Sequence, residues 1–253
     1  MTNDILTLLG QHRSVRQFDG QPLSSSEVNT LVDAAQHAAT STFAQQYSII
    51  SITDPVIKHE LGNISGHHWL EKSGHYFMMV ADQHRNLQIA TAAHANTDIL
   101  HSFDKFLAGT FDAAIATEAI VTAGESLGLG STIMGSILNH AQSVIDLLHL
   151  PSLTFPLLGI AIGHPAENPD LKPRLPQPLM HFDNQYALPT DFNQQLSGYD
   201  ARVAEYYQHR NSHLKQIDFS QHMVQELSRD PKLRSELIQV ISQQGFDVSA
   251  HEV

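Results

Sequence analysis

Two short cationic clusters are prominent in a chain that has few cations. His12-Arg13-Ser14-Val15-Arg16 places two guanidinium groups and a hydroxyl group close together, and Lys172-Pro173-Arg174 sets two cations around a proline that fixes the backbone. Guanidinium and hydroxyl groups donate hydrogen bonds in a geometry that suits a phosphate or a delocalised oxyanion. Taken alone, each cluster is more typical of a solvated or salt-bridged surface than of a binding site.

Two further segments are rich in small residues. Ala39-Thr40-Ser41-Thr42-Phe43 follows a predicted helix and offers hydroxyl groups, and the segment 127–136 is interrupted by glycines. Glycines there would let a flat ligand approach the backbone amides closely. The alternative interpretation of the second segment is a helix C-cap followed by a tight turn.

Common catalytic motifs are absent from the sequence. It contains no G-x-x-x-x-G-K-[ST], no G-x-S-x-G and no H-E-x-x-H. Gly128, Gly130 and Gly135 have the wrong spacing for a dinucleotide-binding fingerprint, and they follow a helix instead of a strand. The sequence therefore excludes a Rossmann-type site.

Histidines are numerous, at 17 in the chain. Groups such as His67-His68 with His75, or His94 with His101, suggest a metal, but they arise easily by chance at this frequency. We therefore predict no dedicated metal site.

Composition limits the partners and the compartment. The 14 Lys and Arg against 26 Asp and Glu give a net charge of −12, which argues against nucleic acid and against an anionic membrane surface. The nearly continuous apolar stretch 155–163 is far shorter than the roughly 20 residues of a transmembrane helix. The absence of cysteine excludes disulfides and thiolate nucleophiles, and the N-terminus lacks a secretory signal. We expect a cytoplasmic protein.

Helices and strands alternate irregularly along the chain. Ser24 and Glu27 form a predicted capping box before an amphipathic helix, and Asp54-Pro55 begins another helix. A long apolar helix is predicted from about Asp98 to Leu127, and Asn139 is the expected cap of the next helix. Strands are predicted over 47–53, 76–81, 131–135 and 155–162. The pattern predicts an α+β fold with a mostly antiparallel central sheet.

The character of the chain changes after residue 163. Five prolines between His164 and Pro178 require an extended course. Helical segments follow at about 190–209 and 218–244, after a short N-terminal helix over 4–10. We predict a single domain over 1–253, in which about 190–253 forms a helical arm or cap.

Taken together, these segments resemble the nitroreductase family, and within it the NADPH-linked, FMN-containing branch of oxygen-insensitive nitroreductases and flavin reductases. The resemblance runs in order along the whole chain, through the segments 12–18, 40–43, 125–130, 165–176 and 199–210. It implies a central sheet surrounded by helices, and an intertwined homodimer with FMN at the interface and a C-terminal helical excursion.

The resemblance also implies roles for individual residues. Arg13, Ser14, Lys172 and Arg174 would hold the phosphate and ribityl end of FMN, and Arg16 would lie near N1 and O2 of the ring. A guanidinium there stabilises the negative charge that two-electron reduction leaves on the flavin. The backbone amides of Gly135 and Ser136 would face N5 and O4. The remaining implied contacts are His12, Val15, Thr40, Ser41, Thr42, Phe43, His68, Ile133 and Met134.

Three positions depart from the branch pattern. His68 stands where the branch usually has a glutamine, Ser136 replaces a second glycine, and Ile133 replaces an aromatic residue. None of these changes removes flavin binding in principle. For the 2′-phosphate of NADPH the resemblance points loosely to Arg210 and Lys215, so the preference over NADH is weakly specified.

The implied reaction is a ping-pong transfer of two electrons from NADPH or NADH, through FMN, to a planar acceptor. Nitroaromatics, quinones, azo compounds and free flavin fit that description. Three alternatives remain open from the sequence: a dedicated FMN reductase that supplies reduced flavin to a partner, a flavin-binding sensor or storage module with little turnover, and an acidic scaffold protein without a cofactor.

Overall fold

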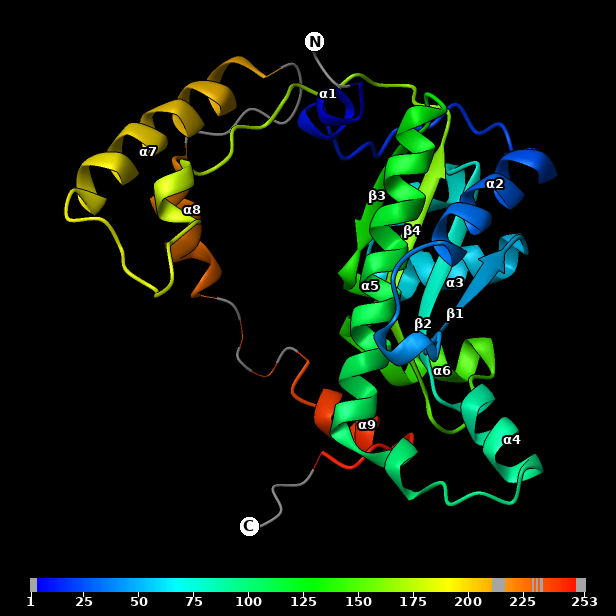
Figure 1. Ribbon diagram of the computed structural model, residues 1–253. Helices are drawn as coiled ribbons and strands as arrows, with labels where there is room; N and C mark the ends of the chain where they lie inside the picture. Colours follow the sequence, from blue (N-terminus) through cyan, green and yellow to red (C-terminus); the bar gives the residue numbers. More distant parts are fainter. Residues whose placement is uncertain (1–3, 211–216, 229, 231, 233, 249–253) are drawn as a thin grey trace. The chain divides into compact units, whose positions relative to one another are not determined.

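A four-stranded antiparallel sheet is the framework of the larger of two compact units (Figure 1). The computed structural model describes residues 4–210, 217–228, 230, 232 and 234–248. The strands are β1 (Tyr47–Ile52), β2 (His75–Asp82), β3 (Gly130–Met134) and β4 (Thr154–Gly163), in the order β1-β2-β4-β3, and each neighbouring pair is antiparallel. The predicted α+β class with a mostly antiparallel sheet is confirmed.

The larger unit comprises residues 1–167 and 234–253, and the smaller unit comprises 168–233. The chain therefore leaves the sheet unit after the last strand and returns to it near its C-terminus. The organisation predicted from the sequence, one domain with an arm from about residue 190, stays a prediction.

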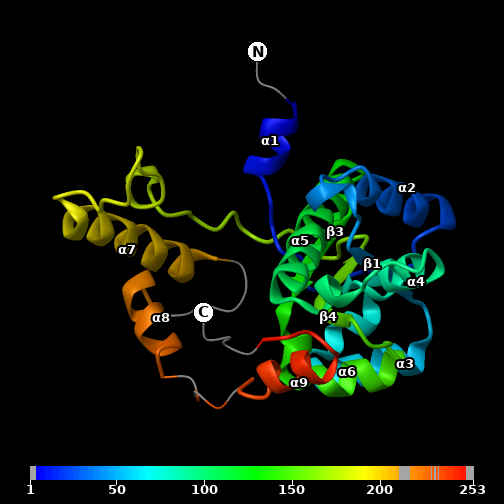
Figure 2. The same cartoon turned by 60° about the horizontal axis from the view of Figure 1, so that its bottom comes forward.

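Helices cover both faces of the sheet (Figure 2). β2 is buried along its whole length, and its alternate residues point to opposite faces. Phe77, Met79 and Ala81 pack in one core cluster with α2 (Ser25–Gln36) and α5 (Phe103–Ser126). Tyr76, Met78 and Val80 pack in the other with α3 (Pro55–Ser65) and α6 (Ala141–Leu148). The apolar strand predicted from residues 76–81 is thus buried on both sides.

The long apolar helix is shorter than the sequence predicts. A 3₁₀ turn, η3 (Asp98–His101), precedes it, and the Ser102 hydroxyl caps α5 by accepting from the Lys105 amide. By length and composition alone α5 would suffice to cross a bilayer, and half of its most apolar window is buried within the structure. It is the core helix of the sheet, but Phe103, Phe111 and Ile115 remain exposed on it.

Local sequence signals place several helix ends correctly. The Ser24–Glu27 capping box is present, the Asp54 carboxylate caps α3 before Pro55, and α1 spans Asp4–Gly10 as expected. The expectation for Asn139 is wrong: α6 begins at Ala141, with His140 as a cap that makes no side-chain bond. The helix α4 (His84–Ala92) was not predicted.

The smaller unit is held by one helix stripe. In α7 (Phe192–His209), the buried residues Tyr199, Val203 and Tyr207 recur every four positions. They pack with Ile217 and with Phe219, the first residue of α8 (Phe219–Glu226). The segment predicted as one helix over 218–244 is instead broken into α8 and α9 (Leu237–Gln243), and α9 lies in the larger unit. There its Val240 joins the main core.

One buried histidine makes the stability of the fold depend on pH. Burial, together with the charge of Lys58, lowers the pKa of His75 to about 4. Below pH 6.5 the unfolded chain takes up a proton at this imidazole while the folded chain does not, so the free energy of unfolding decreases between pH 6.5 and 4. We expect a loss of up to about 3 kcal/mol from this group. Urea unfolding of His75→Gln across this range should give a flatter pH profile than the parent; parallel profiles would contradict the assignment.

Candidate active site

The segment around Arg13–Phe18 runs along the β3 side of the sheet. Ser14 pairs in parallel with Ser131, the Val15 amide donates to the Ser131 carbonyl at 2.8 Å, and the Thr132 hydroxyl donates to the Val15 carbonyl at 2.6 Å. Val15 also packs directly on Gly130, where a Cβ would lie 2.6 Å from a Val15 methyl group. The backbone is therefore fixed beside the first residues of β3, and the segment continues to Phe18, which pairs with Pro165 just after β4.

The two guanidinium groups of this segment have unused donors. Arg13 donates from its terminal nitrogens to the backbone and side-chain oxygens of Gln11, but its buried Nε has no acceptor in the described structure. The Arg16 side chain is exposed and has no hydrogen-bond or ion-pair partner among the described residues. Two cationic groups without counter-ions on a rigid backbone are the donor set that a phosphorylated or anionic ligand requires.

A carboxylate fixes the backbone beside these cations. Glu167 Oε1 accepts from the amides of Arg16 and Gln17 at 2.6 and 3.0 Å, and the Ala166 amide donates to the Gln17 carbonyl at 2.8 Å. The sequence analysis placed Glu167 only within a proline-rich stretch. No spacing pattern links it to Arg16, because the two residues are 151 positions apart in the chain.

His12 is occupied in a different way. Its Nδ1 lies 2.6 Å from Oε1 of Glu125 on α5, and the side chain of Glu125 is mostly buried. The pair fixes His12 at the start of the cationic segment. A direct contact of His12 with FMN stays a prediction.

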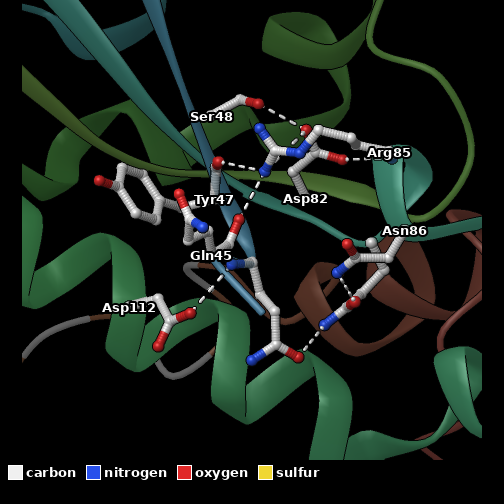
Figure 3. Close-up of polar contacts among 9 residues, drawn as sticks. Gln45, Tyr47, Ser48, Asp82, Arg85, Asn86 and Asp112 are labelled. Carbon is white, nitrogen blue, oxygen red and sulfur yellow. Dashed lines mark hydrogen bonds and ion pairs between the residues drawn. The ribbon is translucent and has the colours of Figure 1, made fainter. Parts of the chain in front are cut away.

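The hydroxyl-rich segment is a tight 3₁₀ turn, η1 (Ser41–Phe43). Thr42, Phe43 and Gln45 all have positive φ angles, a region that L-residues rarely adopt. The Asp112 carboxylate on α5, almost fully buried, accepts from the Ser41 amide at 2.7 Å. It also accepts from the Gln46 amide at 2.9 Å (Figure 3). Asp112 therefore holds this turn from beneath while the Phe43 side chain remains exposed.

A polar network continues from the turn to the edge of the sheet (Figure 3). Gln83 Nε2 donates to the Gln46 side chain and to the Lys105 carbonyl, each at 2.8 Å. The Arg85 guanidinium donates to the carbonyls of Gln45 and Tyr47. Both ends of the turn are thus anchored, which the sequence did not reveal because every partner is distant along the chain.

The glycine-punctuated segment is β3 followed by η4 (Gly135–His140). Gly135 and Ser136 are the first residues of η4, where helix amides lack carbonyl partners within the helix. Arg234 donates to the Gly135 carbonyl at 2.9 Å and to Asn139 Oδ1 at 3.1 and 2.9 Å. Arg234 thereby fixes the turn at Gly135, which the sequence analysis predicts to contact FMN. The sequence did not reveal this role of Arg234, because no local pattern links it to a residue about 100 positions earlier. The side chain of Ile133 is partly exposed and that of Met134 is buried.

His68 begins η2 (His68–Lys72), and its Nδ1 lies 2.8 Å from Glu71 Oε1. The imidazole is exposed, and its Nε2 has no partner among the described residues. Its predicted contact with the flavin stays a prediction.

The remaining predicted cations lie in the smaller unit. Lys172 sits 5.6 Å from the ring centre of Tyr207, and Arg174 donates to the Lys172 carbonyl at 2.8 Å. Arg210 lies 5.6 Å from the rings of both Tyr206 and Tyr207. Lys215 lies outside the described residues. Convergence of Lys172 and Arg174 with the larger unit's arginines on one ligand stays a prediction.

A shallow cavity of about 370 Å³ opens beside Arg210 within the smaller unit. Two guanidinium groups, of Arg202 and Arg210, border it together with an aromatic ring, two carboxyl groups and an imidazole. Its lining is Asp170, Leu171, Pro173, Arg202, Glu205, Tyr206, His209 and Arg210. The cavity therefore combines a stacking surface with cations.

Known proteins match the chain over nearly its full length. The family model described as "Nitroreductase family" matches residues 9–164, and the one described as "Nitroreductase family, C-terminal domain" matches 172–249. An FMN reductase (NADPH) of Bacillus subtilis strain 168 is 36% identical over 250 residues, which cover 98% of this chain and 99% of the relative.

Solved structures share the fold. The NfrA1 nitroreductase from B. subtilis superimposes with a TM-score of 0.89 at 34% identity, covering 96% of this chain and 98% of that one. The NADPH:FMN oxidoreductase from Vibrio harveyi, solved in complex with NAD⁺, gives a TM-score of 0.86 at 27% identity, covering 98% and 100%.

Proposed function

The chain belongs to the nitroreductase family, and from this premise we propose that it is an FMN-dependent NADPH oxidoreductase. The observation that carries the proposal is the pair of arginines with unused donors, Arg13 and Arg16, on a backbone fixed by the first residues of β3 and by Glu167. Relatives named FMN reductase (NADPH) and NADPH-dependent oxidoreductase support the cofactor and the electron donor.

The residues of the larger unit fit FMN. Arg13 has an orphaned, buried Nε suited to a phosphate, and the first amides of η4 are suited to the oxygen and nitrogen edge of a flat ring. When bound, FMN supplies the redox chemistry by taking up hydride from NADPH and delivering two electrons to an acceptor. Arg16 would stabilise the anionic charge of the reduced ring, while Asp112, Glu167 and Arg234 hold backbone segments of the predicted site.

No nucleophile or strong general base is required for this chemistry. The proposed acceptors are planar, electron-poor compounds such as nitroaromatics, quinones, azo compounds and free flavin, since a shared stacking position selects mainly by shape. In the smaller unit, Arg210 at its cavity supports recognition of the 2′-phosphate of NADPH. Lys172 and Arg174 are proposed to add to the FMN phosphate site.

We propose a homodimer with FMN at the interface. Three large apolar side chains, Phe103, Phe111 and Ile115, are exposed on α5, and a second copy would remove them from water. The intertwined arrangement and the cytoplasmic location remain proposals, as does the single domain with a C-terminal arm.

The deciding experiment is spectroscopic. The purified protein is expected to be yellow or to become so with FMN, and to bleach under argon with NADPH. Menadione should then reoxidise it over many turnovers. Arg210→Ala is expected to raise the KM for NADPH several-fold and to leave that for NADH unchanged. A protein that stays colourless after incubation with FMN contradicts the assignment, and one that is yellow but turns over negligibly supports a sensor or storage role instead.

A further inference from the structure

Two histidines and a glutamate meet where α3 and η2 pack together. His59 Nδ1 lies 3.2 Å from Glu71 Oε1, and His68 Nδ1 lies 2.8 Å from the same oxygen. The three ligand atoms all lie within 4.8 Å of one another, and all three residues are exposed. As a metal ligand, the sequence analysis considered His68 only together with His67 and His75, so it missed this cluster.

The local fold explains why these residues converge. His68 and Glu71 are three residues apart on a 3₁₀ helix, where side chains at this spacing eclipse one another. Gly66 ends α3 in the left-handed conformation, and the His67 amide returns to the Gly62 carbonyl at 3.1 Å, which folds η2 back over α3. His59 then faces the pair from the middle of α3.

A glycine keeps the space between the three side chains open. A Cβ at Gly62 would lie 2.9 Å from His68 Nδ1 and 3.2 Å from Glu71 Oε1, inside the cluster. Gly62 occupies the interior of α3, where alanine is favoured over glycine by about 1 kcal/mol. The missing methyl group thus costs helix stability and leaves room at the ligand atoms.

From this geometry we propose that His59, His68 and Glu71 form a binding site for a divalent transition-metal ion, with Zn²⁺ as the best-suited ion. Two imidazoles and one carboxylate are a donor set that zinc accepts, and metal–ligand bonds of about 2.0–2.1 Å place tetrahedral ligand atoms roughly 3.3 Å apart. The two distances in the cluster, 3.2 and 2.8 Å, are close to that value. Solvent exposure leaves the fourth position to water.

The electrostatics favour a cation at this point. The Glu71 carboxylate contacts both imidazoles, so the one acidic group of the cluster lies against both of its other proposed ligands. The chain carries a net charge of −12. The nearby ammonium group of Lys58 is turned away, since it donates to the Ser73 carbonyl at 2.9 Å.

The test titrates untagged, flavin-loaded protein with Zn²⁺ in competition with a chromogenic chelator. We expect one tight site per chain, weakened about tenfold or more in His59→Ala. Gly62→Ala is expected to weaken zinc binding several-fold and to melt at the same or a higher temperature, because its methyl group displaces the imidazole without removing a ligand. His37→Ala is the matched control, since His37 is an exposed histidine whose imidazole contacts a single acidic residue, Asp33, within the described part of the chain. The zinc affinity of this variant should equal that of the parent.

Two results would overturn the proposal: equal zinc affinity in the parent and in His59→Ala, or an equal loss in His37→Ala. X-ray absorption at the zinc edge adds an independent readout, since two imidazole ligands are expected in the parent and one in His59→Ala. Flavin absorbance, recorded in the same samples, reports on the proposed function separately, because His59 has no predicted role at FMN.

Discussion

Arg16→Ala is expected to slow the reduction of bound flavin by NADPH about a hundredfold and to weaken flavin retention, while the protein stays folded. The guanidinium is exposed and has no partner among the described residues, so its removal breaks no internal contact. What is lost is the fixed positive charge that stabilises the reduced ring, an electrostatic effect that commonly contributes about 10²–10³ in rate. Stopped-flow absorbance under argon measures the rate, and the visible spectrum measures occupancy.

Two neighbouring variants serve as controls for Arg16. Arg16→Lys keeps a charge but loses the planar fork, so an intermediate rate is expected. Gln17→Ala alters the next exposed side chain and leaves the backbone bond to Glu167 in place, so it should behave like the parent. Normal occupancy together with normal single-turnover reduction in Arg16→Ala would remove Arg16 from the chemistry.

Asp112→Ala is expected to lower the free energy of unfolding by about 3 kcal/mol and to reduce flavin occupancy together with it. The variant leaves the buried amide of Gln46 and the part-buried amide of Ser41 without their acceptor, and an unsatisfied buried donor costs about 1–3 kcal/mol. The strained turn at Thr42 and Phe43 then loses its anchor and relaxes. Urea unfolding monitored by fluorescence gives the stability.

The isosteric variant Asp112→Asn separates the two hydrogen bonds. Its single oxygen keeps one amide partner, and its NH₂ group faces the other donor, so a loss between those of the parent and of Asp112→Ala is expected. An unfolding midpoint of Asp112→Ala equal to that of the parent would mean that the turn is held by other contacts. The polar chain through Gln46 and Gln83 would then be the first candidate.

Short-range signals made the frame of the molecule predictable. The Ser24–Glu27 box, the Asp54-Pro55 helix start and the apolar run of β2 each depend on residues within a few positions, and all three are present. The prediction failed for Asn139, whose side chain accepts from Arg234 instead of capping α6. A partner 95 residues away overrode the local preference.

The sequence predicts the cations of the site, but it does not predict the residues that hold the backbone around them. Arginine and serine types in the segment 12–16 indicate an anion, but the groups that hold them, Glu167, Asp112 and Arg234, lie far along the chain. Such contacts follow from topology. The cluster of His59, His68 and Glu71 was missed for the same reason, because it depends on how η2 folds back over α3.

The anchoring of η1 from beneath also has a consequence for protein engineering. Because Asp112 fixes the backbone of this turn, the exposed side chains at positions 42 and 43, which are predicted to lie at the flavin, are suitable positions for saturation libraries aimed at acceptor preference. The left-handed backbone at these two positions limits which residues such a library can use: glycine, asparagine and aspartate are tolerated best, whereas valine and isoleucine are poor choices.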